Sequence, residues 1–359
     1  MIEEDLLREY LRKIKPVNHI AKRRVMLKEA KSLKITNSLG NLDVVARQVL
    51  SIKEEIETSN FKKAIVVMAG DHGVAEESVS VFKSSTTGKV LKMIGEGKAP
   101  INAIADTSNA ILMAVDMGII EEIDSCSEII NMKLGDGTKN ISNGPAMSRE
   151  QAISGIIKGI QLVSLKPLID MDIIAVGEIG IANTTSSSAI TSLLCKKDPR
   201  EVVGKGTGVN IETQNRKIEV IKRSIYLNQP NPNDPLDVLS KLGGFEIAGV
   251  VGVILGAAIN KIPVVIDGYI SSVAALLACK LSNDVLDYII LSHLSAEPGH
   301  KYLAVELEKF SLLDLGMCLG QASGAGLCLS LIESACAVHL KTATIYEANL
   351  IADDKNKVK

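Results

Sequence analysis

Short runs of apolar residues recur along the chain, and each of them ends in a polar turn. Five runs of this kind span residues 64–69, 110–115, 173–176, 262–266 and 288–291. Longer segments with a helical period lie between them, as at 151–165 and 245–260. Near-continuous apolar strands that alternate with helices are typical of a parallel sheet covered by helices on both faces. The pattern therefore predicts an α/β fold whose functional edge is the row of strand carboxyl ends.

The two ends of the chain have a different, helical pattern. Near the N-terminus, one helix face collects the apolar side chains of Leu6, Leu7, Tyr10, Leu11 and Ile14. We expect a helix of this kind to pack on a neighbouring element or on a partner subunit. The chain has a helical pattern again from Ser330 onward. Between these ends, residues 228–235 contain three prolines and are expected to form neither a helix nor a central strand.

Composition and charge exclude several classes of protein. The 359 residues are 46% hydrophobic, which is enough for a large core and for more than one typical domain. A net charge of −2 and 3% aromatic residues, with no Trp, give no footprint for nucleic acid or a membrane surface. Six cysteines without a CxxC pair predict free thiols in a reducing cytoplasm. No secretory signal is visible, and the apolar run 247–259 is shorter than a bilayer span.

Two glycine-containing turns are candidate binding segments. The strand predicted at 173–176 is followed by Gly177-Glu178-Ile179-Gly180, which offers backbone N–H groups and one negative charge where ligands of α/β proteins bind. Downstream, Gly204-Lys205-Gly206-Thr207-Gly208 can form a nest of N–H groups for phosphate, although a plain loop fits it equally well. Neither segment has the pattern of a Walker loop or of a dinucleotide fingerprint. Lys217 follows in a helical stretch, where it could add a charge to a phosphate or stand in solvent.

An acid and an imidazole occur together in Gly70-Asp71-His72-Gly73, at the end of another predicted strand. One such pair supplies too few ligands for a metal ion, and His293 and His300 are spaced wrongly for one helix face. We therefore expect no metal, and a carboxylate that fixes the turn or orients a histidine. The small residues of 314–326 leave two interpretations open: close approach to a ligand, or close packing of helices.

Together, these segments resemble the nicotinate-nucleotide–dimethylbenzimidazole phosphoribosyltransferase family, which activates the lower ligand of cobamides. The resemblance covers most of the chain, from residue 64 to residue 347. Its motifs are residues 69–74, 137–141, 145–149, 177–180, 183–185, 204–208, 227–230, 242–246, 263–268 and 293–300. Because so many motifs match in one order, the resemblance is specific.

The resemblance implies a fold, a reaction and an assembly. It implies a large Rossmann-like domain over 61–329, a small helical domain built from 1–60 and 330–359, and a dimer. The implied reaction transfers ribose 5-phosphate from nicotinate mononucleotide to an aromatic acceptor and releases nicotinate. It implies neither a metal nor an organic cofactor.

The resemblance also implies roles for individual residues. Glu178 would lie near the ribose and the departing nicotinate, where a carboxylate stabilises an oxocarbenium-like centre. The phosphoribosyl and nicotinate groups would be held by Gly180, Gly204, Gly206, Gly208, Lys217, Ser295 and Gly320. The acceptor pocket would be formed by Ser80, Phe82, Lys89, Val90 and Leu319.

This chain departs from the family at the position of the general base. The family has a glutamate where Gln321 stands here, and an amide cannot accept a proton at neutral pH. General-base help is worth about 10²–10⁴ in rate. The acceptor pocket differs as well, because Phe82 and Lys89 replace a tyrosine and a glutamine, and Lys83 is new.

Three hypotheses follow from these departures. The chain is an active enzyme with an unusual acceptor such as a phenol, whose proton (pKa ≈ 10) can leave without a strong base. Alternatively, it is a catalytically weak subunit of a heterodimer with a paralogous chain. The third hypothesis is an ordinary azole-using enzyme whose base comes from elsewhere in the site. A dinucleotide-dependent oxidoreductase is disfavoured because the fingerprint is missing.

Overall fold

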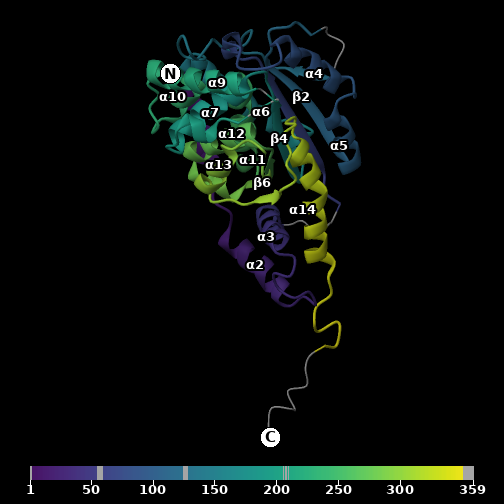
Figure 1. Ribbon diagram of the computed structural model, residues 1–359. Helices are drawn as coiled ribbons and strands as arrows, with labels where there is room; N and C mark the ends of the chain where they lie inside the picture. Colours follow the sequence, from purple (N-terminus) through teal and green to yellow (C-terminus); the bar gives the residue numbers. More distant parts are fainter. Residues whose placement is uncertain are drawn as a thin grey trace.

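A parallel sheet of seven strands forms the centre of this computed structural model (Figure 1). The structure describes residues 2–54, 60–123, 128–204, 206, 208 and 210–350. The strand order is β3-β2-β1-β4-β5-β6-β7, and every neighbouring pair is parallel. The strands are β1 (Lys63–Gly70), β2 (Ala110–Gly118), β3 (Ile129–Asn131), β4 (Ile173–Ile179), β5 (Val264–Ile266), β6 (Ile289–His293) and β7 (Ser311–Leu313).

All five strands expected from the apolar runs are present, so the α/β fold with a parallel sheet is confirmed. The two edge strands, β3 and β7, were not expected. Each has only three residues, and their side chains are half-buried or exposed, so neither produces a continuous apolar run.

Helices cover both faces of the sheet. They are α1 (Ile2–Lys13), α2 (His19–Ala30), α3 (Asn41–Lys53), α4 (Ser85–Gly95), α5 (Pro100–Ser108), α6 (Arg149–Val163), α7 (Asn183–Leu194), α8 (Pro199–Val202), α9 (Ile211–Asn228), α10 (Pro235–Leu242), α11 (Phe245–Ile259), α12 (Tyr269–Leu281), α13 (His300–Glu306) and α14 (Ser323–Lys341). Short 3-10 turns occur at η1 (Gly73–Glu77), η2 (Leu168–Asp170) and η3 (Asn283–Asp287).

Two cores lie on opposite faces of the sheet, because successive strand side chains point to opposite sides. In β1, Val66 and Met68 join the core beneath α6, α11 and α12. Ile65 and Val67 join the second core beneath α3, α5 and α14. Every residue of β1 is buried, which explains why its sequence is apolar without alternation.

The pair α6 and α11 is packed unusually closely, because glycines face one another at the crossing. A Cβ atom on Gly159 would lie 2.3 Å from the carbonyl oxygen of Gly249. A Cβ atom on Gly252 would lie 2.1 Å from the carbonyl oxygen of Ile156. The glycines of the apolar segment 247–259 therefore serve helix packing rather than ligand binding.

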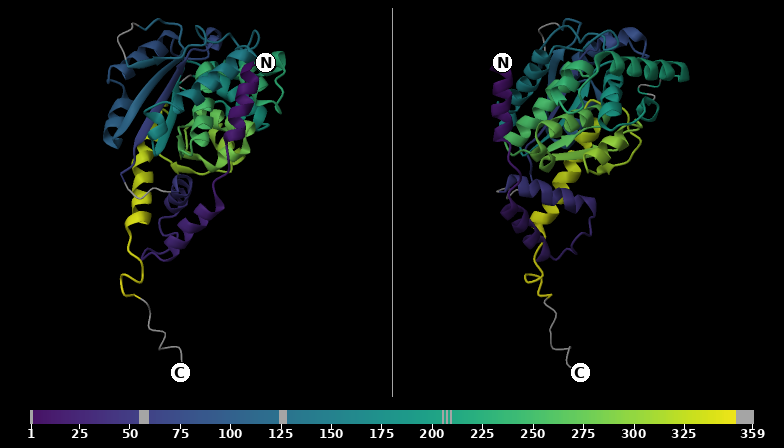
Figure 2. Two further views of the ribbon diagram at one scale, coloured as in Figure 1. Left: turned by 180° about the vertical axis from the view of Figure 1, so that it is seen from behind. Right: turned by 90° about the vertical axis from the view of Figure 1, so that its left-hand side faces the viewer.

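The helices at the two ends of the chain lie in different places. α2 and α3 lie together beyond the amino edge of the sheet, next to the lower half of α14 (Figure 1). A β-bridge between Ser32 and Thr344 ties the two chain ends together there. In contrast, α1 packs on α6 and α11 (Figure 2). The expected division into a small domain of 1–60 and 330–359 and a large domain of 61–329 remains a prediction, and residues 351–359 lie outside the described part.

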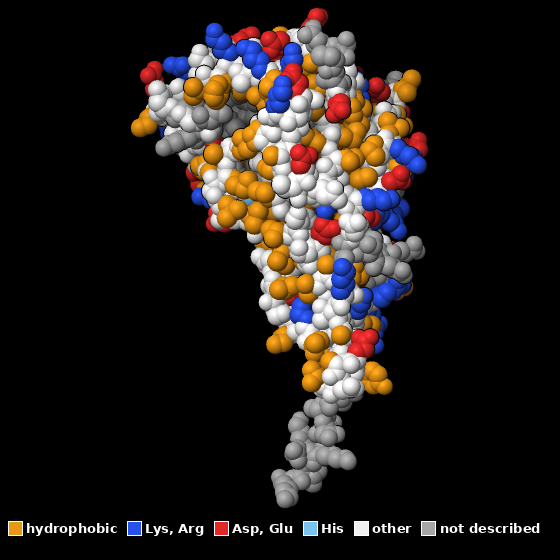
Figure 3. Space-filling view, turned by 90° about the vertical axis from the view of Figure 1, so that its right-hand side faces the viewer, with side chains coloured by type: hydrophobic (Ala, Val, Ile, Leu, Met, Phe, Trp, Pro, Cys, Tyr) orange, Lys and Arg blue, Asp and Glu red, His pale blue; other side chains and the backbone are white. Residues whose placement is uncertain are grey.

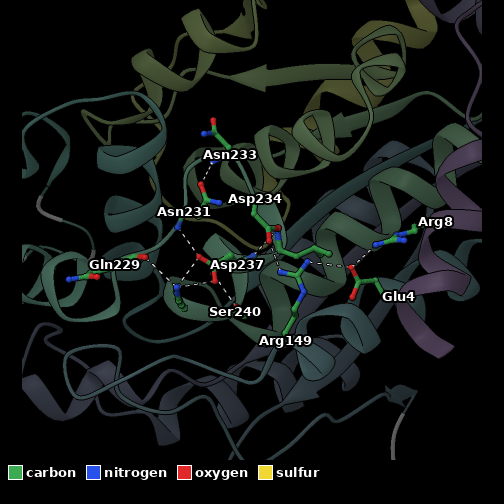
Figure 4. A network of polar contacts seen from close by, with 11 residues as sticks. Glu4, Arg8, Arg149, Gln229, Asn231, Asn233, Asp234, Asp237 and Ser240 are labelled. Carbon is green, nitrogen blue, oxygen red and sulfur yellow. Dashed lines mark hydrogen bonds and ion pairs between the residues drawn. The ribbon is translucent and has the colours of Figure 1, made fainter. Parts of the chain in front are cut away.

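A polar network fixes α1 to the body of the molecule (Figure 4). Arg149 at the start of α6 pairs with Asp234 at 2.8 Å and with Glu4 of α1 at 3.5 Å. Asp234 also caps α10 by accepting a hydrogen bond from the backbone N–H of Leu236. The turn at 228–235, in which no helix or central strand was expected, thus serves as an anchoring point.

One helix of the described residues is long and apolar enough to cross a bilayer, and that helix is α14. More than half of it is buried, and it packs on β4, β5 and β6 as well as on α3 and α5. These contacts are those of a core helix.

Candidate active site

A cavity of about 420 Å³ opens at the carboxyl edge of the sheet. Its walls come from the turns after β4, β5 and β6, from α4, and from the loop between β7 and α14. Nine of the residues expected in the site line this cavity: Phe82, Val90, Glu178, Gly180, Gly206, Ser295, Leu319, Gly320 and Gln321. A smaller hollow of about 40 Å³ adjoins it and contains two more of them, Ser80 and Lys217.

Glu178 lies near the end of β4, almost completely buried. Its carboxylate accepts a hydrogen bond from the side-chain amide of Asn183, at the start of α7. Burial, together with the negative charges of Glu246 and Asp267, raises the pKa of Glu178 to about 8. A carboxyl with such a pKa can change its charge near neutral pH, which is the property required of a catalytic acid or base.

Lys217 lies at the other end of the site and is only 1% exposed. Its ammonium donates a hydrogen bond to the hydroxyl of Thr184 over 2.7 Å. Burial lowers the pKa of this lysine to about 8. The alternative that Lys217 stands in solvent is therefore wrong, since the ammonium is held inside the protein beside the N-terminus of α7.

The glycine turn lies close to this buried ammonium. A Cβ atom on Gly206 would lie 3.6 Å from the Nζ atom of Lys217. The backbone N–H of Gly206 donates a 2.7 Å hydrogen bond to Glu297, so it already binds a carboxylate oxygen. Gly204 lies against the same carboxylate, whereas Gly208 is exposed, and a Cβ atom placed on it would meet nothing within 4 Å among the described residues. This arrangement of one cation and one N–H group suits a phosphate.

The turn before α14 brings Gln321 to Glu178. Gln321 and Ala322 both have a left-handed backbone, with φ of 59° and 61°, which is uncommon for residues with side chains. The backbone N–H of Gln321 donates to the carbonyl oxygen of Glu178 over 3.1 Å. The side-chain oxygen of Gln321 is buried and has no hydrogen-bond partner among the described residues. A buried acceptor without a partner in the wall of a cavity is available to a ligand.

Asp267 and His293 line the inner part of the cavity. Asp267 accepts hydrogen bonds from the backbone N–H groups of Gly324 and Ala325, at 2.9 and 3.1 Å, and so caps α14. Burial raises the pKa of Asp267, and His293 lies 3.7 Å from it.

Ser295 is held in place by His300, a fully buried histidine behind the cavity wall. The backbone N–H of Ser295 donates to Nδ1 of His300 over 2.9 Å. Burial lowers the pKa of His300 to about 4, so the ring is neutral at pH 7. Its proton therefore lies on Nε2, which is 2.9 Å from the hydroxyl of Ser272. The neutral ring positions the Ser295 turn without adding charge to the cavity.

The expected acceptor pocket is only partly assembled. Phe82 and Leu319 line the open side of the cavity and are each half exposed. Lys89 instead lines a separate hollow with Lys92 and Glu121, on the outer side of α4. Lys83 is exposed.

Several residues of the cavity were not named as site residues beforehand, namely Thr184, Asp267, His293 and Glu297. A signal for each existed, because all four belong to motifs that follow predicted strands. Within the described residues, no three His, Cys, Asp or Glu side chains gather in a way that could hold a metal ion.

Comparison with known proteins decides the family. The family model described as Phosphoribosyltransferase matches residues 14–350. The chain belongs to this family. It is 40% identical to the nicotinate-nucleotide–dimethylbenzimidazole phosphoribosyltransferase of Desulforudis audaxviator, over 96% of this chain and 98% of that protein. The enzyme of the same name from Ruminiclostridium cellulolyticum is 42% identical over 87% and 89% of the two chains.

A solved structure agrees with this assignment. The crystal structure of the enzyme of that name from Thermus thermophilus superposes with a TM-score of 0.87 at 29% identity. It covers 94% of this chain and all of the other. The fold and the resemblance expected from the motifs are thereby confirmed.

Proposed function

We propose that this phosphoribosyltransferase moves ribose 5-phosphate from nicotinate mononucleotide to an aromatic acceptor that becomes the lower ligand of a cobamide. The observation that carries the proposal is that one site holds a buried ammonium near one end and a buried carboxyl at its centre. Lys217 supplies the cation and Glu178 the carboxyl. The names of the relatives indicate the same donor.

The phosphate of the donor would bind beside Lys217. The ammonium, the hydroxyl of Thr184 and the N–H of Gly206 can all donate hydrogen bonds to phosphate oxygens. Glu297 now accepts the Gly206 hydrogen bond, so the phosphate would replace one anion by another. Ser295, on the loop after β6, lines the larger cavity, which shares Thr184 and Gly206 with the hollow of Lys217, and adds a hydroxyl.

Transfer breaks the bond between C1′ of the ribose and the pyridine nitrogen, and the electron pair leaves with nicotinate. The ribosyl centre becomes positive as the bond breaks. Ionised Glu178, which is almost completely buried, stabilises this charge. The acceptor atom then forms a bond to C1′ from the opposite face, and its proton must be lost.

Gln321 favours an acceptor that carries a hydrogen-bond donor. Its unpartnered oxygen can accept a hydrogen bond from a phenol O–H or an azole N–H, but it cannot remove the proton. Glu178 is the neighbouring carboxylate, since a Cβ atom on Gly320 would lie 3.6 Å from its Oε1 atom. We infer that ionised Glu178 takes the proton. A phenol is the better acceptor than dimethylbenzimidazole because the phenol proton (pKa ≈ 10) can leave without a strong general base.

A dimer, either of two identical chains or with a paralogous subunit, is part of the proposal. Hydrophobic side chains gather on the face that carries α4, α5 and α14 (Figure 3). Leu327 and Leu331 of α14 contribute to the exposed apolar surface, at 41% and 37% exposure. An apolar face of this kind supports subunit association.

The five described cysteines are all unpaired, which supports a reducing cytoplasmic location.

The decisive experiment is an assay of the purified chain with nicotinate mononucleotide and, separately, phenol, p-cresol and dimethylbenzimidazole. Released nicotinate is measured for each acceptor. We expect release that depends on the phenols and is weaker with the azole. Gln321→Glu restores a general base and should raise azole turnover by up to about 10²–10⁴.

Two other outcomes would change the proposal. Turnover with dimethylbenzimidazole alone would contradict the phenolic acceptor and assign this chain to the azole-using enzymes. Binding of nicotinate mononucleotide without turnover of any acceptor would make the chain a weak subunit that requires a paralogous partner.

A further inference from the structure

Two motifs have no role in the proposed binding of nicotinate mononucleotide, yet they meet directly behind the active site. The first is the segment Gly70-Asp71-His72-Gly73 that follows β1. The second is Gly244-Phe245-Glu246, at the N-terminus of α11. Both contact the turn that carries Glu178, and both bury charged side chains completely.

The centre of this cluster is a pair formed by His72 and Glu246. Nε2 of His72 lies 2.7 Å from Oε1 of Glu246, and neither side chain has any exposed surface. The other ring nitrogen, Nδ1, lies 3.0 Å from the hydroxyl of Ser186 in α7. The second carboxylate oxygen of Glu246 is buried and has no hydrogen-bond partner among the described residues.

Three glycines enclose the Glu246 carboxylate. A Cβ atom would lie 2.5 Å from its Oε2 if placed on Gly244, and 2.9 Å if placed on Gly70. A Cβ atom on Gly180 would lie 3.3 Å from its Oε1. These glycines come from three separate motifs, and at each of them a side chain would press on the same carboxylate.

Glu246 lies against the turn that carries Glu178. The side chain of Asn183 donates a hydrogen bond to Glu178, and its Nδ2 atom would lie 3.3 Å from a Cβ atom on Gly180. That same Cβ position is 3.3 Å from Glu246. The Asn183 amide, which holds Glu178, and the Glu246 carboxylate therefore both flank Gly180, two residues beyond Glu178. Among the described residues, no lysine or arginine forms an ion pair with Glu178 or Glu246.

A purely stabilising role does not account for this arrangement. Burying a carboxylate with a histidine removes both from water, and the desolvation offsets most of their attraction. A carboxylate oxygen left without a partner adds a further penalty. Such an arrangement is retained more readily when the buried charge acts on a neighbouring functional group.

We propose that Glu246, held in place by His72, is a positioning residue that sets the charge of Glu178 during phosphoribosyl transfer. The inference rests on the proposed role of Glu178. The charged groups that face Glu178 are Glu246 and Asp267, and those that face Glu246 are His72 and Asp71. The negative charge of Glu246 disfavours ionisation of Glu178 in the empty site, and the cationic ribosyl group then favours it.

The test is the pH dependence of kcat/KM in Glu246→Gln. The substitution keeps the shape of the side chain and removes its negative charge, so ionisation of Glu178 becomes easier. The acid limb of the kcat/KM profile, which reports ionisation of Glu178, should move to lower pH by about one unit. Glu212→Gln is the matched control, because Glu212 is an exposed carboxylate on α9 that pairs with Arg216. The control should leave the limb in place.

Two further variants keep the test decisive. If Glu246→Gln does not fold, Glu246→Asp withdraws the charge by one methylene and should move the limb in the same direction by less. An unmoved acid limb in the folded variant overturns the inference. Glu178→Gln separates the two proposals, because full activity in that variant would reject the role of Glu178 itself.

Discussion

Lys217 is the residue whose removal tests the phosphate end of the site most directly. Lys217→Met keeps the length and the apolar stem of the side chain but removes its charge. A hydrogen bond to a charged group contributes about 1.5–3 kcal/mol. We therefore expect the Kd for nicotinate mononucleotide to rise by about 10- to 150-fold, measured by calorimetry.

The control for this change is Lys222→Met on the same helix. Lys222 is about one-third exposed and pairs with Glu219 at 2.8 Å, away from the cavity. The Lys222→Met variant should bind nicotinate mononucleotide with the same Kd as the unaltered chain. An unchanged Kd in Lys217→Met would contradict the placement of the phosphate.

The pH dependence of the reaction follows from two groups, one that must lose its proton and one that must keep it. Glu178 must be ionised, so activity increases as the pH rises through its pKa of about 8. Lys217 must be protonated, so activity is lost as the pH rises above its pKa of about 8. We predict a narrow, bell-shaped profile of kcat/KM centred near pH 8. A profile that is flat from pH 6 to 9 would show that at least one of these groups is not required.

Sequence reasoning identified the chemistry of these residues better than their surroundings. The motif around Glu178 gave its place at a strand end, because strand ends are marked by apolar runs that stop at polar residues. The burial of Lys217 could not be read from α9, whose pattern is that of a charged surface helix. The direction of Lys89 depends on which side of α4 faces the cavity, and one sequence does not fix that rotation.

At the level of elements, the crossing of α6 and α11 should be the least tolerant part of the fold. Gly252→Ala would place a methyl group 2.1 Å from the carbonyl oxygen of Ile156, and neither helix backbone can move without disturbing the core. Overpacking of this kind costs about 1–3 kcal/mol. Differential scanning calorimetry should show a lowered Tm.

Gly144→Ala is the matched control for that substitution. A Cβ atom on Gly144 would have no neighbour within 4 Å among the described residues. The Tm of the Gly144→Ala variant should stay close to that of the unaltered chain. Equal effects of the two substitutions would contradict the close packing of α6 and α11.

The elements that were predicted and those that were missed differ in length and burial. β1 and β4 are long and buried, and their sequences show it directly. β3 and β7 have three residues each and form only because a neighbouring strand offers its free edge. The position of α1 on α6 depends on contacts such as Arg149 with Glu4, which connect distant parts of the sequence.

For the whole molecule, the apolar face on α14 predicts association. We expect the purified chain to sediment as a dimer, and the double variant Leu327→Glu with Leu331→Glu to sediment as a monomer. Both leucines are partly exposed on one helix, and a buried carboxylate in an interface is costly. Leu165→Glu, at a residue 58% exposed beyond the end of α6, is the control. A dimer that persists in the double variant would place the interface elsewhere.

One cysteine in the cavity wall is exposed while the other described cysteines are buried or half-buried, so a thiol reagent can label the wall of the cavity selectively. Of the five cysteines in the described part, Cys318 is the exposed one, and it lies in the cavity wall beside Leu319. Burial raises the pKa of Cys195 to about 11 and those of Cys279 and Cys328 to about 12, which suppresses their thiolates. Brief treatment with iodoacetamide should therefore alkylate Cys318 ahead of these three, as peptide mapping by mass spectrometry would show. A saturating acceptor should slow that labelling, so the rate of alkylation would report occupancy of the site without any turnover.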